Sequence, residues 1–404
     1  MTSSESTPKH IVIIGGGIIG CTTAYYLTSR LSSSENASQS TTSITLIEAS
    51  IHGPAQGASG KAGGLVARWA YPKELVSMSY PEHERLAQTH DGKERWGWRY
   101  VNCGTWEGRG EDVGSAGSTN QKGKRSLEKE LGLPGGTKPK AQGKGKGRKE
   151  KGLPQDLEWV KEELTDAYSP MAKDGETAQV HPYLFTTSMF EMAKERGLKY
   201  IHGFAKKIIR ANAKVTGVEY REGKDGEFKI IEATHVVLAA GAWSPRILEE
   251  LPISPTRAHS VTIRPSPDVK IAPYVLFTEI SMPISDSSTD YKTVSPEIYA
   301  RPDNEVYACG PGDDFPLPDS VDEVQVDPEA CNSIVQHVSS ISEELRAGTV
   351  EKRQACYLPT VDTGNGPIIG EARDIAEGLY IATGHTCWVS HFHLLVFCLE
   401  MLVL

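Results

Sequence analysis

The chain has 404 residues, of which 38% are apolar and 24% charged, a composition typical of a soluble globular protein with one large or two ordinary cores. The net charge of −9 disfavours nucleic acid as a general partner, and no apolar run reaches the roughly 20 residues that span a bilayer. Seven cysteines without a CxxC pair indicate a reducing compartment and no metal site.

The first predicted element is a buried strand over residues 11–14, and a glycine-rich turn follows it directly. Gly15, Gly17 and Gly20 stand in GxGxxG spacing, with Ile18 and Ile19 between them, and a helix comes next. In such a turn the glycines allow a sharp bend, close approach of the backbone to a pyrophosphate, and tight packing of the helix on the sheet. The phosphates then lie at a helix N-terminus, which favours negative charge.

A second strand, SITLIEAS over residues 43–50, supports this interpretation. It ends on Glu48, followed by Ala49, and an acid at this place accepts hydrogen bonds from the ribose hydroxyls of a dinucleotide. The spacing exceeds the usual value of about 20 residues, because a serine-rich loop lies between the helix and the strand. The alternative is a plain glycine turn with a surface glutamate, but the two motifs together favour an adenine dinucleotide site.

A glycine-rich loop, QGASGKAGG, follows over residues 56–64, and a basic segment interrupts the chain further on. Residues 121–151 carry eleven Lys and Arg against three Glu, a net charge of +8. With almost no large apolar residues, the stretch 107–152 is predicted to be a disordered insertion. It is interpreted mainly as a solvated loop, with contact to RNA or an acidic membrane as the alternative.

The remaining pattern predicts a second kind of domain between two pieces of the first. Helices are expected over 153–164, 182–197 and 333–345, and several strands over 199–238 with turns at Gly217 and 224–226. Short alternating strands over 253–308 predict an antiparallel sheet, and residues 378–383 return to a parallel type of strand. The nucleotide-binding domain is therefore expected to be discontinuous in sequence.

Three further motifs establish a resemblance. THVVLAAGAWSP (234–245), GLYIATGHTCW (378–388) and QGASGKAGGLVARWAYP (56–72), with the first glycine motif, resemble the D-amino acid oxidase-like (DAO) family of FAD-dependent oxidoreductases, in a fungal branch. The family includes glycine oxidase and sarcosine oxidase. The resemblance implies an α/β fold: a discontinuous Rossmann-like FAD-binding domain (8–72, 176–248 and 351–388) and an α+β substrate domain on an antiparallel sheet (73–106, 153–175 and 249–350).

The resemblance also implies which residues contact FAD. Gly15, Gly17 and Gly20 would hold the pyrophosphate, and Glu48 the adenosine ribose. The remaining cofactor contacts would come from the two loops and the two later turns: Ile18, Ile19, Ala49, Ser59, Gly60, Lys61, Ala62, Gly63, Gly64, Ala240, Gly241, Trp243, Gly384 and His385. For Ser59 and Lys61 the alternative is a merely flexible loop.

The substrate side depends on fewer residues. Arg68 falls near the place where sarcosine oxidases carry an arginine, whose guanidinium can hold a substrate carboxylate through two hydrogen bonds; the alternative is a surface salt bridge. Arg264 and Arg301 are weaker candidates, and Tyr299 and Tyr307 line either the pocket or the sheet core. Lys61 and His385 complete the catalytic candidates.

Cys356 lies in QACYLPTVD, which resembles the segment where sarcosine oxidase-like enzymes attach flavin covalently to a cysteine. A buried structural cysteine is the favoured interpretation, with the thioether as the alternative.

The implied activity is oxidation of a C–N bond of a small amine or amino acid. Hydride goes to flavin N5, and O2 reoxidises the flavin to give H2O2. The alternative is an FAD-binding regulatory protein with little or no turnover, for example in endosomal trafficking. We expect a cytoplasmic location, with the peroxisome or endosome as alternatives, and no nucleic acid partner or transmembrane segment.

The end of the chain departs from the family pattern. Residues 389–404, VSHFHLLVFCLEMLVL, contain no glycine and are apolar on nearly every side. Val389-Ser390 can be encoded by a splice-donor sequence, so we interpret this tail as translated intron; HxH metal ligation by His391 and His393 is the weaker alternative.

Overall fold

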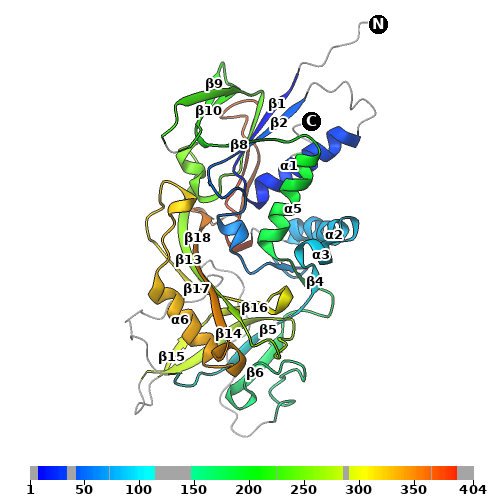
Figure 1. Ribbon diagram of the computed structural model, residues 1–404, viewed down its shortest axis with the longest axis vertical. Coiled ribbons are helices and arrows are strands. Elements are labelled where there is room, and N and C mark those ends of the chain that lie inside the picture. The colour runs from blue at the N-terminus through cyan, green and yellow to red at the C-terminus, as the bar shows by residue number, and fades with distance from the viewer. Residues whose placement is uncertain are drawn as a thin grey trace.

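The computed structural model describes residues 8–33, 42–71, 73–113, 147–223, 225–284, 291–364 and 366–388. The molecule is elongated, with one sheet near each end of its long axis (Figure 1). The basic residues 114–146 and the tail 389–404 lie outside the described residues.

A six-stranded sheet carries the glycine motif, and its strands come from four distant parts of the chain. Its order is β19-β20-β12-β1-β2-β8, parallel except for β19. The strands are β1 (His10–Ile14), β2 (Ser43–Glu48), β8 (Lys199–His202), β12 (His235–Leu238), β19 (Ile368–Glu371) and β20 (Leu379–Thr383). The predicted discontinuous, Rossmann-like arrangement is confirmed.

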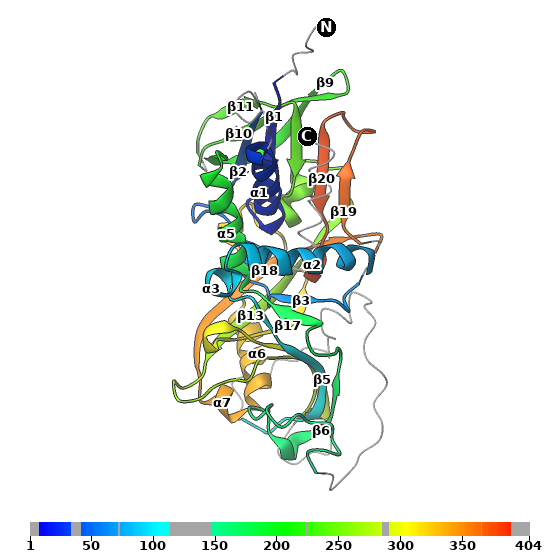
Figure 2. The ribbon, with the colours of Figure 1, turned by 90° about the vertical axis from the view of Figure 1, so that its right-hand side faces the viewer.

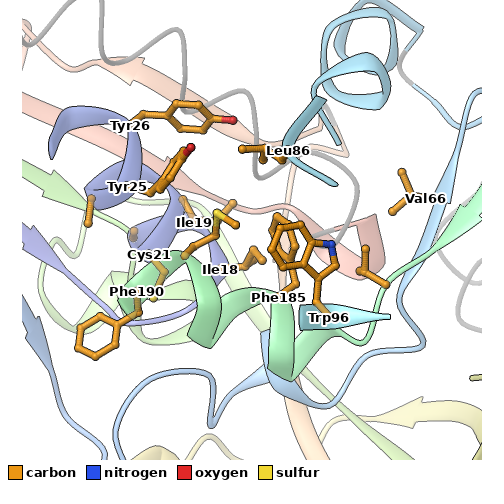
Figure 3. Close-up of a cluster of buried hydrophobic side chains, with 14 of the residues drawn as sticks. Ile18, Ile19, Cys21, Tyr25, Tyr26, Val66, Leu86, Trp96, Phe185 and Phe190 are labelled. Atoms are coloured by element: carbon orange, nitrogen blue, oxygen red, sulfur yellow. The ribbon is translucent and has the colours of Figure 1, made fainter. Parts of the chain in front are cut away.

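Successive residues of β1 point to opposite faces of this sheet, and each face is covered. Ile11 and Ile13 belong to a buried cluster with helices α1 (Ile18–Ser33) and α5 (Pro182–Glu195). Figure 3 shows the core of that cluster. Val12 and Ile14 face a small antiparallel sheet of β9 (Phe204–Ala211), β10 (Lys214–Arg221) and β11 (Phe228–Glu232). An all-apolar strand is therefore required, as expected for a buried parallel sheet.

The second large sheet is mainly antiparallel, as predicted, with order β18-β13-β17-β16-β14-β5-β6 and β15 paired to β14. Its strands are β5 (Asn102–Arg109), β6 (Thr165–Pro170), β13 (Ile253–Arg264), β14 (Tyr274–Pro283), β15 (Tyr291–Val294), β16 (Glu297–Ala300), β17 (Val306–Asp313) and β18 (Thr349–Val361). Helices α6 (Pro328–Ser339) and α7 (Glu343–Arg346) share its buried cluster.

Helix α2 (Lys73–Thr89) crosses the molecule between the two large sheets (Figure 2). Beside it lie α3 (Gly92–Trp96) and a three-stranded sheet of β3 (Leu65–Ala67), β7 (Thr177–Gln179) and β4 (Arg99–Tyr100). Short 3-10 turns follow several strands: η2 (Ala58–Gly60), η3 (Glu162–Leu164), η4 (Gly241–Arg246), η5 (Pro302–Asn304), η6 (Val321–Glu323) and η7 (Thr386–Trp388).

Two local predictions were wrong. Residues 153–164 form turns and the short η3 instead of a helix, because the Arg148 guanidinium binds the carbonyl oxygens of Pro154 and Leu157 and holds this segment in an irregular path. Gly217 lies inside β10, not at a turn, and the chain reverses at Asn212 and Ala213, both with positive φ. A Cβ on residue 217 would lie 2.8 Å from the Ile231 carbonyl oxygen, so this glycine serves close strand approach.

The expected domain boundaries stay a prediction, but some elements fall differently from them. Helix α2 shares a buried cluster with α1 and α5, and β18 pairs with β13 of the antiparallel sheet. Strand β5 continues to Arg109, past the expected start of the insertion at residue 107. Within the described ranges, no helix is long and apolar enough to cross a membrane.

Candidate functional site

A cleft opens where the parallel strands β1, β2, β12 and β20 end. The open space inside it, including its mouth, is about 1120 Å³. Loops at the carboxyl ends of parallel strands are where such sheets bind ligands. The expected cofactor residues that line it are Gly15, Gly17, Ile19, Glu48, Ala49, Ser59, Ala240, Gly241, Trp243 and His385.

The three motif glycines meet different neighbours. Gly15 has φ +108°, and a Cβ there would lie 2.4 Å from the Ala239 carbonyl oxygen. A Cβ on Gly20 would lie 1.9 Å from the Gly15 carbonyl oxygen, so this glycine lets α1 start against the turn. A Cβ on Gly17 would meet only the Ser59 Oγ, at 3.1 Å, and Gly17 lines the cleft. The missing side chain at Gly17 therefore leaves space for a ligand, whereas at Gly15 and Gly20 it avoids a clash with the protein's own backbone.

Glu48 lies buried at the end of β2, facing the glycine turn. Its carboxylate accepts the Gly16 N–H at 2.5 Å and the Ser50 N–H at 2.8 Å. Burial raises the pKa of Glu48, while these backbone hydrogen bonds lower it in part. The carboxylate is thus oriented by the backbone and lines the cleft.

The loop around η2 joins the start of α1 to the antiparallel sheet. The Ser59 Oγ accepts the Ile18 N–H at 2.9 Å, which caps one of the unpaired amides at the start of α1. The Lys61 ammonium donates to the Ala355 carbonyl oxygen on β18 at 3.0 Å, and burial lowers the pKa of Lys61. The predicted cofactor loop is therefore placed between the two large sheets.

Glycines of the same loop are required by close packing. A Cβ on Gly60 would lie 1.9 Å from the Ala55 carbonyl oxygen, and one on Gly63 would lie 2.7 Å from the Tyr299 ring. Gly64 has φ +87°. The loop contains these glycines because its backbone packs too closely against Ala55 and Tyr299 to leave space for side chains. This close packing does not support the alternative of a flexible loop.

Cys356 lies on β18, in a small buried cluster with Ala258 and Leu358 against Ala58 and Cys387. Burial raises the pKa of its thiol to about 11, partly offset by the positive charge of Lys61. At neutral pH the side chain is therefore a thiol rather than a nucleophilic thiolate. The structure brings it to the cofactor loop but gives it the environment of a structural cysteine.

The two later turns close the cleft. The Thr383 Oγ1 donates to the Gly241 carbonyl oxygen at 3.1 Å, which joins the end of β20 to η4. Gly384 has φ +81°. His385 is 2% exposed, and its Nε2 has no hydrogen-bond partner within the part of the chain that the structure describes. Burial lowers the pKa of His385 to about 3, so the imidazole is neutral.

Arg68 does not lie with the expected residues of the cleft and the cofactor loop. Its guanidinium pairs with Glu84 at 2.9 Å on the surface and lies over the Tyr80 ring, 4.2 Å from the centroid. It does not line the cleft. Arg264 likewise pairs with Glu351, at 3.0 Å, with more than a third of its side chain exposed. The surface salt bridge, the alternative for Arg68, is the arrangement that the structure shows.

Arg301 is the arginine that reaches the cofactor loop. It is 3% exposed, donates to the Ala62 carbonyl oxygen, pairs with Glu305 at 2.8 Å, and lies over the Tyr307 ring. Sequence reasoning missed Glu305, although Arg-x-x-x-Glu across the tight β16–β17 connection was a signal for it. The buried pair positions Arg301 between the loop and the antiparallel sheet.

A second buried acid, also missed, lies on the same sheet. The Glu297 carboxylate accepts the Tyr299 hydroxyl at 2.6 Å and faces the Cys309 thiol at 3.6 Å. Burial raises the pKa of Glu297. Because Tyr299 packs on Gly63, these side chains continue the polar interior that begins at Lys61.

Comparisons with known proteins agree on one family. The family model DAO, described as FAD dependent oxidoreductase, matches residues 10–391. "Putative oxidoreductase TDA3" of Saccharomyces cerevisiae is 32% identical, covering 94% of this chain and 88% of that protein. "Putative oxidoreductase C1F5.03c" of Schizosaccharomyces pombe is 29% identical, covering 95% and 90%.

Solved structures agree on the fold. Glycine oxidase from Geobacillus kaustophilus has a TM-score of 0.68 at 15% identity, covering 97% of this chain and 94% of its own. L-amino acid deaminase from Proteus vulgaris has a TM-score of 0.63 at 15% identity, covering 99% and 94%. At these identities the likeness shows the fold alone.

Proposed function

The chain belongs to the DAO family of FAD-dependent oxidoreductases, and from this premise we propose that it binds FAD in the cleft and oxidises a C–N bond of a small amine or amino acid. The observation that supports this most is that ten of the expected contacts, from four distant parts of the chain, line one cleft. Glu48, Gly17, Ser59 and His385 are among them.

The residues present fit the cofactor. Gly17 leaves a space that a Cβ would narrow, at the N-terminus of α1, where backbone amides favour phosphate. Glu48 offers an oriented carboxylate to the ribose. When bound, FAD would supply two-electron oxidation of the substrate's C–N bond, with O2 as the final electron acceptor and H2O2 as its product.

The protein's own residues would supply orientation and electrostatics. The Lys61 ammonium donates to the Ala355 carbonyl oxygen, next to Cys356 on β18, and neutral His385 lines the cleft. Arg301 does not line the cleft, but it is held by Glu305 against the Ala62 carbonyl oxygen of the cofactor loop, and it is therefore the candidate for the substrate's polar group. Arg68 has no place in this proposal, because its guanidinium is paired on the surface.

The test is an absorption spectrum of the purified protein before and after acid precipitation, followed by a peroxide assay. We expect flavin bands that move to the supernatant, because the Cys356 thiol is buried and protonated. Colour kept in the pellet would instead assign Cys356 as the attachment site. H2O2 should form with at least one member of a panel of primary amines, N-methyl amines and amino acids.

The alternative outcomes separate the two functions. Bound FAD with no peroxide from any panel member would favour the regulatory role. A protein that takes up no FAD at all would contradict the cofactor assignment itself.

A further inference from the structure

The segment that leaves β17 and enters α6 crosses the cleft, and we call residues 314–327 the strap. Both of its ends are fixed to the antiparallel sheet by β13. The Arg257 guanidinium pairs with Asp313 at 2.9 Å, just before the strap, and donates to the Gln325 carbonyl oxygen at 3.1 Å. The Asp327 N–H donates to the His259 Nε2 at 3.0 Å.

The middle of the strap is fixed to one wall of the nucleotide-binding sheet. The Arg246 guanidinium pairs with Asp319 at 2.8 Å and donates to the Leu317 carbonyl oxygen at 2.7 Å. The Trp243 indole N–H donates to the Pro318 carbonyl oxygen at 2.9 Å. Arg246 and Trp243 both belong to η4, which follows β12.

Three residues later, the strap is fixed to the opposite wall. The Asp322 carboxylate accepts the Ser50 hydroxyl at 2.5 Å and the Ile51 N–H at 3.0 Å, directly after β2. Between the anchors at Asp319 and Asp322 lie Ser320 and Val321, and both line the cleft. The strap therefore spans the cleft from one wall to the other, beside Glu48.

We propose that the strap is a second wall of the cofactor site, which closes over the adenosine end and must open for FAD to enter or leave. A ligand whose ribose lies at Glu48 would have the strap across its exit. Asp322 would act as the latch, because its side chain joins the strap to the residues after β2 through two hydrogen bonds. The inference rests on the FAD binding of the proposed function, but not on oxidation of any amine.

Charge and latching predict opposite effects of removing Asp322. Its carboxylate lies close enough to Glu48 to raise the pKa of that side chain, so it adds negative charge near an anionic ligand. By charge alone, Asp322→Ala would slow FAD release. If Asp322 is a latch, the same change speeds release.

The experiment follows the recovery of free flavin fluorescence after FAD-loaded protein is diluted. We expect Asp322→Ala to release FAD at least about tenfold faster than wild type, since two hydrogen bonds to a charged acceptor are lost. The matched control is Glu377→Ala, which removes a carboxylate paired with Lys214 before β20, at the other end of the same sheet. The control should release FAD at the wild-type rate.

Amide hydrogen exchange of the wild-type protein provides a measurement that needs no variant. FAD should slow exchange across residues 317–323 more than in β19 at the sheet edge. Unchanged or slower release from Asp322→Ala, or strap amides insensitive to FAD, would overturn the proposal while leaving FAD binding and amine oxidation intact. No uptake of FAD by wild type would overturn both.

Discussion

Two alanine substitutions in the glycine motif distinguish a glycine that the fold requires, Gly20, from a glycine that FAD binding requires, Gly17. Gly20→Ala puts a methyl group 1.9 Å from the Gly15 carbonyl oxygen, a backbone atom that no side-chain rotation can move. An exposed helical Gly→Ala change would gain about 0.5–1 kcal/mol. Here overpacking costs about 1–3 kcal/mol or more, so we expect a net loss of stability. Gly17→Ala meets only the Ser59 Oγ, at 3.1 Å, and should change stability by no more than about 0.5 kcal/mol.

FAD affinity should distinguish the variants differently from stability, because Gly17→Ala should weaken FAD binding although it leaves the fold stable. The added methyl of Gly17→Ala occupies the place where the backbone approaches phosphate, so we expect FAD affinity to fall at least about tenfold, or about 1.4 kcal/mol. Urea unfolding of the FAD-free variants and fluorescence titration with FAD measure the two quantities separately. Gly17→Ala with wild-type affinity, or Gly20→Ala with wild-type stability, would refute the reasoning from these distances.

Three single variants and one double variant test the buried and surface polar groups. Arg301→Met should lower the free energy of unfolding by about 3 kcal/mol, since it removes the guanidinium that pairs with the buried Glu305 carboxylate at 2.8 Å. Arg301→Met/Glu305→Leu should recover most of this in urea unfolding, and additive losses would contradict the pairing. The pKa of His385 is lowered to about 3, so the unfolded chain binds a proton first as the pH falls below about 6.5. Stability should therefore drop by about 1.4 kcal/mol by pH 5.5, and His385→Asn should remove this part of the pH dependence; an unchanged slope in thermal melts at several pH values would count against it. Arg68→Ala should change kcat/KM less than about twofold, because its guanidinium pairs with Glu84 on the surface and does not line the cleft, and a tenfold loss would return Arg68 to the substrate site.

The parts that sequence reasoning predicted are those in which neighbouring residues determine the structure. The apolar run 11–14, the glycine spacing and the acid at Glu48 each depend on local backbone geometry, and the sheet and cleft confirm the first of these and place the others together. The alternating pattern over 253–308 also depends on neighbouring residues, and the antiparallel pairing of its strands confirms the prediction.

The parts that were missed depend on contacts between distant residues. The apolar positions of residues 153–160 fit a helix, but a guanidinium from Arg148 sets their path. Arg68 and Arg301 look alike in sequence, and only the fold shows that one meets Glu84 on the surface and the other Glu305 in the interior. The strap has no motif, since its partners lie about 70 and 270 positions away.

The strand order has a consequence for how the protein is made. Strands β1 and β2 end by Glu48, but their sheet is completed only when β20 has emerged, at residues 379–383. At ribosomal rates of about 5–20 residues per second, roughly 20 to 70 s pass between synthesis of these first apolar strands and synthesis of β20, the last parallel strand of their sheet. During that interval β1 has neither its full sheet nor a finished cleft. We therefore expect the sheet to stay incomplete during that interval, and FAD to be incorporated only after β20 has joined it.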